Sequence, residues 1–179
     1  EVDGLGQVRC DIAFGGAFYA YVDVKPLGIT VNGENVTQLI DVGRRIKQAV
    51  MASYDIRHPE GDPDLNFLYG TILVQMLDGD AHSRNVCIFA DGEVDRSPTG
   101  TGVSGRLAIH YAQGDLALHQ RIVIESLIGT SFSGRVVETT DISGYPGIIP
   151  EVTGSAFITG VNRLLIDPDD PLKDGFILR

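Results

Sequence analysis

Apolar and polar residues alternate in several short stretches of the chain, a pattern typical of β-strands with one buried face. In residues 5–14 every second side chain from Val8 to Ile12 is apolar. Residues 17–24 follow as a return strand after a glycine pair, which indicates a turn. The pattern predicts five further strands, at residues 66–77, 84–94, 119–129, 131–139 and 155–166.

Residues 35–54 show instead the spacing of an amphipathic helix. Asn35 is a favoured N-cap, and Gln38 stands three residues later, in the position of a capping box. Apolar residues then recur every three or four positions, so one face of the helix is expected to be buried. These residues are Val36, Leu39, Ile40, Ile46, Val50 and Met51.

A second helix is predicted after the sequence DRSPTGTGVSGR. Ser97 is a favoured N-cap and Pro98 a favoured first helical residue, while Gly114 is a plausible stop after Gln113. This helix is narrow on several faces, so strands can pack closely around it. Its small residues are Gly102, Ser104, Gly105, Ala108 and Ala112.

Strands outnumber helices by roughly three to one, so the predicted fold class is α+β. We expect a curved, mostly antiparallel sheet wrapped as a partial barrel around the narrow central helix. Residues 58–64 contain two prolines and a glycine and are predicted to form a surface loop. The segment 167–171 breaks the chain before a short apolar tail.

The composition of the chain argues against some classes of binding partner. The 179 residues include 14 basic and 24 acidic side chains, a formal net charge of −10. This balance argues against nucleic acid and anionic membranes, and no apolar run approaches the ~20 residues of a membrane span. Because the two cysteines, Cys10 and Cys87, form no disulfide framework, we expect a cytoplasmic protein. The chain begins at Glu1 without Met and shows no signal peptide, so a leader or an upstream domain is left open.

A metal centre is not expected, because no histidine has a partner at a metal-ligand spacing. We likewise expect no cofactor, and ordinary structural roles for His82 and Cys87. The histidines are His58, His82, His110 and His119.

The start of the second helix has the composition of an anion site. Gly100 and Gly102 keep side chains away from the unpaired amides of residues 99–103, and the helix dipole adds positive charge. No lysine follows the glycines, so a P-loop does not fit. Asp95 would place a free carboxylate beside these donors, an arrangement suited to a zwitterion such as a small amino acid. The alternative is an ordinary helix start in which Asp95 pairs with Arg96 or caps a turn.

DRSPTGTGVSGR (residues 95–106), preceded by SRNVCIFADGEV, resembles the second active-site motif of the proline racemase family. DIAFGGAFYAYVD (residues 11–23) resembles another signature of that family, and DPDDPLKDGFILR (residues 167–179) resembles its C-terminus. The family includes 4-hydroxyproline 2-epimerases and trans-3-hydroxy-L-proline dehydratases. The resemblance implies the fold of diaminopimelate epimerase, in which two similar halves each clasp a central helix and the active site lies between them.

This chain resembles only the second half of such a protein. The resemblance implies that residues 1–166 form the second domain and that residues 167–179 are a tail packing on the first domain. The motif of the first half, resembling Met-Cys-Gly-His, does not occur in the chain. We therefore expect a fragment, or one chain of a cleaved or truncated protein, whose partner is the missing N-terminal half. A homodimer is left open.

The resemblance also assigns roles to individual residues. Asp95 would accept the hydrogen bonds of the pyrrolidine ammonium, and the backbone N–H groups of Gly100 and Thr101 would bind the carboxylate. Phe89 would line the ring pocket, although it reads equally as a core aromatic residue of a strand. Thr99, expected to be the exposed first-turn residue, stands where racemases and epimerases have their second cysteine.

Thr99 favours elimination over racemisation. Racemisation needs two bases on opposite faces of the α-carbon, and an alcohol cannot ionise near neutral pH as a thiol does. A single cysteine in the first half still permits dehydration of trans-3-hydroxy-L-proline to Δ1-pyrroline-2-carboxylate, with Thr99 bound to the departing hydroxyl. The alternatives are a racemase or epimerase that tolerates threonine, a non-catalytic imino-acid-binding domain, and a structural protein with a decayed site. The fragment alone is expected to be inactive.

Overall fold

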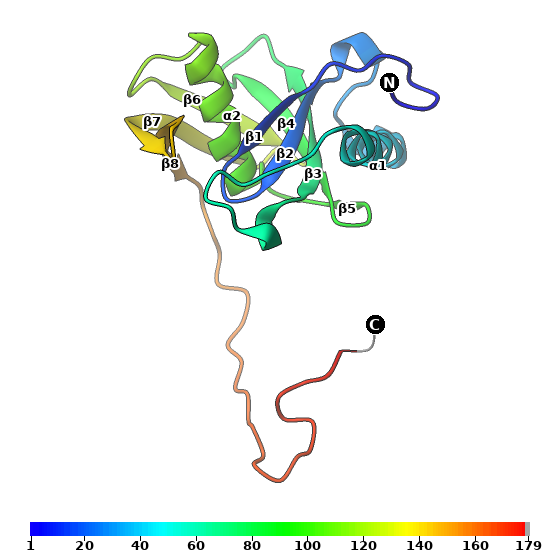
Figure 1. Ribbon diagram of the computed structural model, residues 1–179, viewed down its shortest axis with the longest axis vertical. Coiled ribbons are helices and arrows are strands. Elements are labelled where there is room, and N and C mark those ends of the chain that lie inside the picture. Colours follow the sequence, from blue (N-terminus) through cyan, green and yellow to red (C-terminus); the bar gives the residue numbers. More distant parts are fainter. Residues whose placement is uncertain (178–179) are drawn as a thin grey trace.

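One sheet curls around a single helix in the computed structural model, which describes residues 1–177 (Figure 1). The strand order is β1-β2-β3-β4-β6-β7-β8, with β5 paired to β4. Five strand pairs are antiparallel, while β2–β3 and β4–β6 are parallel. The predicted class is confirmed: a curled, mostly antiparallel sheet with few helices. The strands are β1 (Asp11–Phe14), β2 (Phe18–Asp23), β3 (Leu68–Met76), β4 (Ser83–Phe89), β5 (Glu93–Val94), β6 (Arg121–Ser126), β7 (Ser131–Ile142) and β8 (Tyr145–Thr153).

Each parallel pair is joined by a helix, as parallel strands require a long crossover. The chain passes from β2 to β3 through α1 (Val36–Ser53) and from β4 to β6 through α2 (Gly100–Gln113). The helices cover opposite faces of the sheet, because neighbouring residues of β2 belong to different clusters. Ala20 packs in the core of α1, whereas Tyr19 packs on the face that α2 covers.

Small residues on α2 explain why the sheet can wrap it so closely. A Cβ atom added at Gly102 would overlap the side chain of Ile72, and one added at Gly105 would overlap the hydroxyl of Tyr21. The helix touches β1 and β2 on one side and β7 and β8 on the other. The prediction of a narrow inner helix is therefore confirmed.

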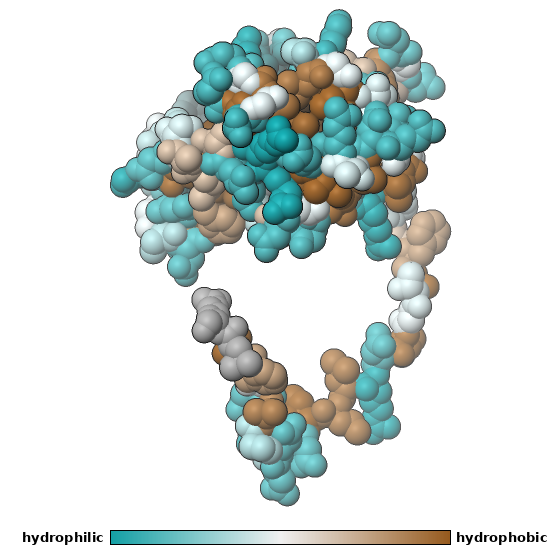
Figure 2. Space-filling view, turned by 90° about the vertical axis from the view of Figure 1, so that its right-hand side faces the viewer, coloured by the Kyte–Doolittle hydropathy of each residue, from teal (hydrophilic) through white to brown (hydrophobic). Residues whose placement is uncertain are grey.

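The strand predicted at residues 155–166 is wrong. Residues 154–177 contain neither strand nor helix and run away from the folded body, from the end of β8 (Figure 1). Figure 2 shows this tail standing clear of the body with its apolar side chains exposed. Alternation alone does not form a strand when no partner backbone lies beside it. The last two residues of the predicted tail 167–179 lie outside the described residues. The exposed apolar side chains are Phe157, Ile158, Val161, Leu164, Leu165, Ile166, Leu172, Phe176 and Ile177.

The sequence reading also missed a strand. β8 contains Pro146 and Pro150, which obscured it, yet it pairs with β7 along nearly its whole length. Proline is tolerated there because β8 lies at the edge of the sheet, where one row of backbone groups needs no partner. At the opposite edge, β1 covers only the last four residues of the strand predicted at 5–14.

The predicted capping box of α1 is absent. Asn35 flanks the helix, but its side chain makes no capping hydrogen bond. The side chain of Asn32 instead accepts a hydrogen bond from the Asn35 amide at 3.0 Å and caps a short 3₁₀ turn, Gly33–Asn35. The chain thus enters α1 through this turn, which the periodicity of the helix could not indicate.

A buried polar cluster lies where α2 meets β4. The Arg106 guanidinium is almost fully buried, and it donates hydrogen bonds to His110 Nε2 at 2.9 Å and to Asn85 Oδ1 at 3.0 Å. The rings of His110 and His82 meet edge to face with centroids 4.9 Å apart. Burial, and then the charge of Arg106, lowers the pKa of His110 and lowers the pKa of His82 to about 4. Both rings are therefore neutral at pH 7.

This cluster predicts that acid destabilises the fold. The pKa of both histidines lies below its unfolded value of 6.5, so the unfolded chain takes up protons first as the pH falls. Their contribution to stability is complete above pH 6.5 and is lost towards pH 4. We expect the urea midpoint to fall between pH 7 and pH 5, and to fall less in His82→Asn. His119→Asn, a substitution at an exposed loop residue, should keep the wild-type dependence. Equal pH dependence in all three proteins would contradict the assignment.

Candidate functional site

The start of α2 lies two residues later than the sequence suggested. The helix begins at Gly100, so Ser97 is not its N-cap and Pro98 is not its first residue. The Ser97 hydroxyl instead accepts a hydrogen bond from the Thr99 amide at 3.0 Å, which closes a turn ahead of the helix. The reason is local: two residues after a serine, an amide is within reach of its hydroxyl, and this bond competes with a helical cap.

Thr99 occupies the N-cap position with a strained backbone. Its φ is 68° and its ψ is 104°, an unusual conformation for a β-branched residue. Only 6% of its surface is exposed, so the expectation of an exposed first-turn residue is wrong. Such strain persists when surrounding contacts fix the conformation, and it is often found at functional sites.

Asp95 supplies the contacts that fix this turn. Its Oδ1 atom accepts a hydrogen bond from the Ser97 amide at 2.8 Å, and its Oδ2 atom accepts one from the Thr99 hydroxyl, also at 2.8 Å. Within residues 1–177 the Asp95 carboxylate forms no salt bridge, so pairing with Arg96 is not observed. The other part of that alternative, in which Asp95 caps a turn, is observed. The carboxylate is half-buried and lies beside the helix start.

Three backbone donors lie next to this carboxylate. Among the described residues, the amides of Gly100, Thr101 and Gly102 have no acceptor, because the first intrahelical bond runs from the Val103 amide to the Thr99 carbonyl. The structure therefore brings Asp95, Thr99, Gly100 and Thr101 together as the sequence predicted. Unpaired amides and a helix dipole beside an acid provide donors for an anion and an acceptor for a cation.

Two tyrosines of β2 hold the first turn of α2, and the sequence reading missed both. The Tyr19 hydroxyl lies 2.9 Å from Thr101 Oγ1, and the Tyr21 hydroxyl donates to the carbonyl of Gly102 at 2.8 Å. Burial raises the pKa of Tyr19 to about 12, so this phenol stays protonated. The available signal was their spacing, because residues two apart on a strand share one face.

Aromatic side chains form a wall beside the helix start. Phe89, at the end of β4, stacks on Tyr69 with ring centroids 5.5 Å apart. Tyr69 in turn meets Tyr19 and Phe67 edge to face. Phe89 is only half-buried, so it belongs to a surface that an apolar ring can contact rather than to the closed core. This wall and the donors of α2 share Tyr19 as a common neighbour.

Cys87 is next to the site but cannot act as its base. Its side chain is 2% exposed, and burial raises the pKa of its thiol to about 12 despite a hydrogen bond with Thr99. A thiol with that pKa is not ionised near neutral pH. His82 lies at the other end of β4, in the Arg106 cluster. The predicted structural roles of both residues agree with these positions.

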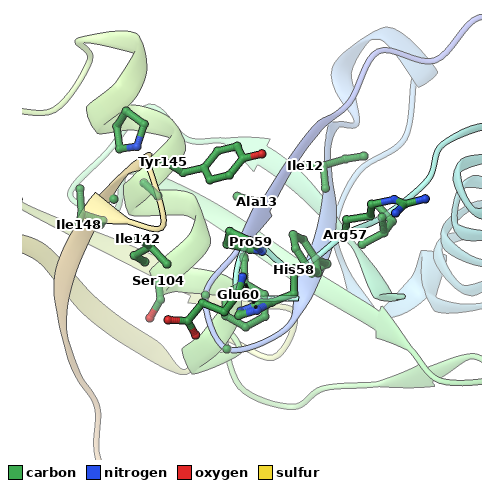
Figure 3. Close-up of a pocket in the computed structure, with 18 of the residues that line it drawn as sticks. Ile12, Ala13, Arg57, His58, Pro59, Glu60, Ser104, Ile142, Tyr145 and Ile148 are labelled. Atoms are coloured by element: carbon green, nitrogen blue, oxygen red, sulfur yellow. Dashed lines mark hydrogen bonds between the residues drawn. The ribbon is translucent and has the colours of Figure 1, made fainter. Parts of the chain in front are cut away.

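A separate groove lies further along α2. This groove of about 770 Å³ runs between β1, the loop at residues 54–60 and the tip of the β7–β8 hairpin. Figure 3 shows Ile142, Ile148 and Ser104 of α2 on one side and Ile12 and His58 on the other. Asp95 and Thr99 are not among the residues that line it.

Residues 1–177 contain neither a cluster of metal ligands nor a membrane-spanning helix. No group of three or more His, Cys, Asp or Glu side chains there is arranged to hold a metal ion. In the same part of the chain, no helix is both long enough and apolar enough to cross a bilayer.

Replacing Asp95 tests whether it holds the strained turn. In Asp95→Asn the negative charge is lost, so the two charge-assisted hydrogen bonds become weaker neutral ones. We expect the free energy of unfolding to fall by about 1–2 kcal/mol, the value of a charge-assisted bond. Urea denaturation measures this change. Asp91→Asn, at an exposed residue of the β4–β5 turn, is the matched control and should change stability little. Equal stability of both variants would contradict the assigned role.

The turn between β1 and β2 is a second point of close approach. A Cβ atom at Gly15 would overlap the carbonyl of Thr101 and would lie 2.6 Å from the amide nitrogen of Gly105, so backbone must move. Gly15→Ala should therefore destabilise the protein by ~2–3 kcal/mol, as overpacked positions do. Gly79→Ala, where the added carbon meets open space, is the control. A thermal midpoint for Gly15→Ala as high as that of Gly79→Ala would show that the contact is not tight.

The chain is similar to known proteins over its whole length. The family model for proline racemase matches residues 1–177. A protein from Colwellia psychrerythraea named trans-3-hydroxy-L-proline dehydratase is 52% identical over all of this chain, which covers 50% of that protein. A Burkholderia multivorans protein named 3-hydroxyproline 2-epimerase is 46% identical over all of this chain, which covers 53% of that protein. A Clostridioides difficile protein named proline racemase is 40% identical over all of this chain, which covers 54% of that protein.

A solved structure agrees with these similarities. The crystal structure of a probable proline racemase from Agrobacterium radiobacter, with bound carbonate, aligns with a TM-score of 0.85 and 32% identity. The alignment covers 98% of this chain and 51% of the other. The chain thus spans about half the length of the relatives it matches.

Proposed function

Because the chain belongs to the proline racemase family, we propose that it forms one half of a dehydratase. The substrate would be trans-3-hydroxy-L-proline and the product Δ1-pyrroline-2-carboxylate. The observation that carries this proposal is Thr99, an alcohol, held at the helix start by Asp95 at 2.8 Å. The 52% identical relative named trans-3-hydroxy-L-proline dehydratase supports the same choice of substrate.

The site would bind the substrate through its two charges. The substrate carboxylate accepts hydrogen bonds from the free amides of Gly100 and Thr101, and its ring ammonium donates to Asp95. Phe89 and Tyr69 lie against the apolar side of the ring. These contacts place the α-carbon near Thr99, with one face of the ring turned away from α2.

The reaction needs one base, which this chain does not provide. A thiolate from the other half of the protein removes the α-proton, the bond from C3 to its hydroxyl breaks, and hydroxide leaves as water with one proton. The resulting enamine tautomerises to the cyclic imine, so one water is lost and no electrons are exchanged with a cofactor. Neither Thr99 nor Cys87, whose pKa is raised to about 12, can supply a second base here.

Thr99 would assist the leaving group. Its hydroxyl donates a hydrogen bond to Asp95 Oδ2 at 2.8 Å. When the substrate ammonium occupies that carboxylate, the Thr99 hydroxyl is released to hydrogen-bond the departing hydroxyl of the ring, directly or through a water molecule. Because Asp95 is then occupied by the ammonium, the Thr99 hydroxyl keeps its proton. Thr99 therefore transfers no proton to or from the second face of the α-carbon.

The other half of the protein would complete the cleft. We propose that residues 1–166 belong to the second domain and that residues 167–179 pack on the first. The exposed apolar side chains of the described tail, among them Leu172 and Phe176, support this arrangement because bare apolar groups of this number favour burial. The isolated chain holds only one side of the site, so we expect it to bind weakly and to be inactive.

A second function has support from the relatives. The 46% identical protein named 3-hydroxyproline 2-epimerase and the 40% identical proline racemase favour an isomerase that tolerates threonine. A threonine at this place would have to act through water, which is a weaker acid than a thiol.

The substrate test separates these functions. The full-length protein is supplied with L-proline, trans-4-hydroxy-L-proline and trans-3-hydroxy-L-proline, and products are followed by chiral chromatography and by trapping the imine. We expect imine only from the 3-hydroxylated substrate. D-proline or an epimer, without any imine, would overturn the dehydratase and establish the isomerase. Thr99→Cys should gain epimerisation, whereas Thr99→Ser should remain a dehydratase, because only the thiol adds a second base.

A further inference from the structure

We propose that Tyr19 is a positioning residue that makes the Thr101 hydroxyl available to the substrate as a third carboxylate donor. The inference rests on the proposed function for the nature of the ligand. It concerns β2, which lies within the signature at residues 11–23. The contact that carries it joins the two hydroxyl groups at 2.9 Å across 82 positions of the sequence.

Burial decides which hydroxyl donates. Tyr19 is 2% exposed, and within residues 1–177 its hydroxyl has no hydrogen-bond partner except Thr101. A buried hydroxyl that kept its proton unpaired would lose substantial stability, so Tyr19 donates and Thr101 Oγ1 accepts. Thr101 itself is exposed, and its own proton is then directed outwards, to solvent or to a ligand.

The Thr101 side chain is held on its other side as well. Its methyl group packs against Gly16, where an added Cβ atom would lie 2.8 Å from Cγ2. With the methyl group on Gly16 and the oxygen on Tyr19, χ1 of this β-branched side chain is fixed. Tyr21, bonded to the carbonyl of Gly102, fixes the backbone of the same turn. The Thr101 hydroxyl is therefore preorganised beside the free amides of Gly100 and Thr101.

The expected effect is on binding rather than on the chemical step. The carboxylate of the substrate keeps its charge throughout the elimination, so a donor to it stabilises ground state and transition state alike. Loss of this donor raises KM and leaves kcat nearly unchanged. A residue that only supported the fold would instead lower the thermal midpoint without this selective change.

A double-mutant cycle in the full-length protein tests the inference. The dissociation constant of pyrrole-2-carboxylate, a planar carboxylate mimic of the substrate, is measured calorimetrically for wild type, Tyr19→Phe, Thr101→Val and the double variant. We expect Tyr19→Phe to raise Kd about fivefold to tenfold and Thr101→Val at least as much. Because Tyr19 acts through Thr101, the double variant should bind no more weakly than Thr101→Val alone. Tyr111→Phe, at the far end of α2, should bind as wild type does.

Three outcomes would overturn the inference: an unchanged Kd in Tyr19→Phe, additive effects in the double variant, or a wild-type protein that does not bind the mimic. Thr101→Ser guards against misfolding, because it keeps the hydroxyl and should retain the sensitivity to Tyr19→Phe. Failure of the proposed function is distinguishable, since it appears as missing imine from trans-3-hydroxy-L-proline while the coupling in ligand binding persists.

Discussion

The close packing of the first turn of α2 against the β1–β2 hairpin is the contact on which the rest of the structure depends. The two backbones are in direct contact there. This is possible because Gly15 has no Cβ atom, which would overlap the carbonyl of Thr101. No side chain caps α2. The Tyr19 and Tyr21 hydroxyls hold its first turn through the Thr101 side chain and the Gly102 carbonyl instead. A helix end held from the side keeps its own amides free, which an ordinary N-cap would partly consume.

The chemistry of the site follows from this arrangement. In the proposed function, the free amides would bind a carboxylate and the Asp95 carboxylate beside them would bind an ammonium, which favours a zwitterion over a simple anion. The backbone of Thr99 is strained. Three hydrogen bonds of Asp95 and Ser97 stabilise this conformation. An alcohol in that position leaves the family framework intact while removing one acid–base group.

The tail after β8 exposes apolar side chains that the folded body does not cover. A folded body ends at β8, and the apolar residues beyond it lie in water without a partner in the described structure. The related proteins are about twice as long as this chain. The proposed second half would supply the opposite wall of the site and cover the apolar tail.

The sequence by itself determined the class of fold, the narrow inner helix and the grouping of Asp95, Thr99, Gly100 and Thr101, because these depend on local periodicity and on neighbours within one motif. It misplaced the helix start, since hydrogen bonds of Ser97 compete with capping, and it predicted a strand at residues 155–166 from alternation without a partner. Only the tertiary structure decided which strand holds the helix start. Side chains 82 positions apart meet through packing, and no local pattern of apolar and polar residues encodes that distance.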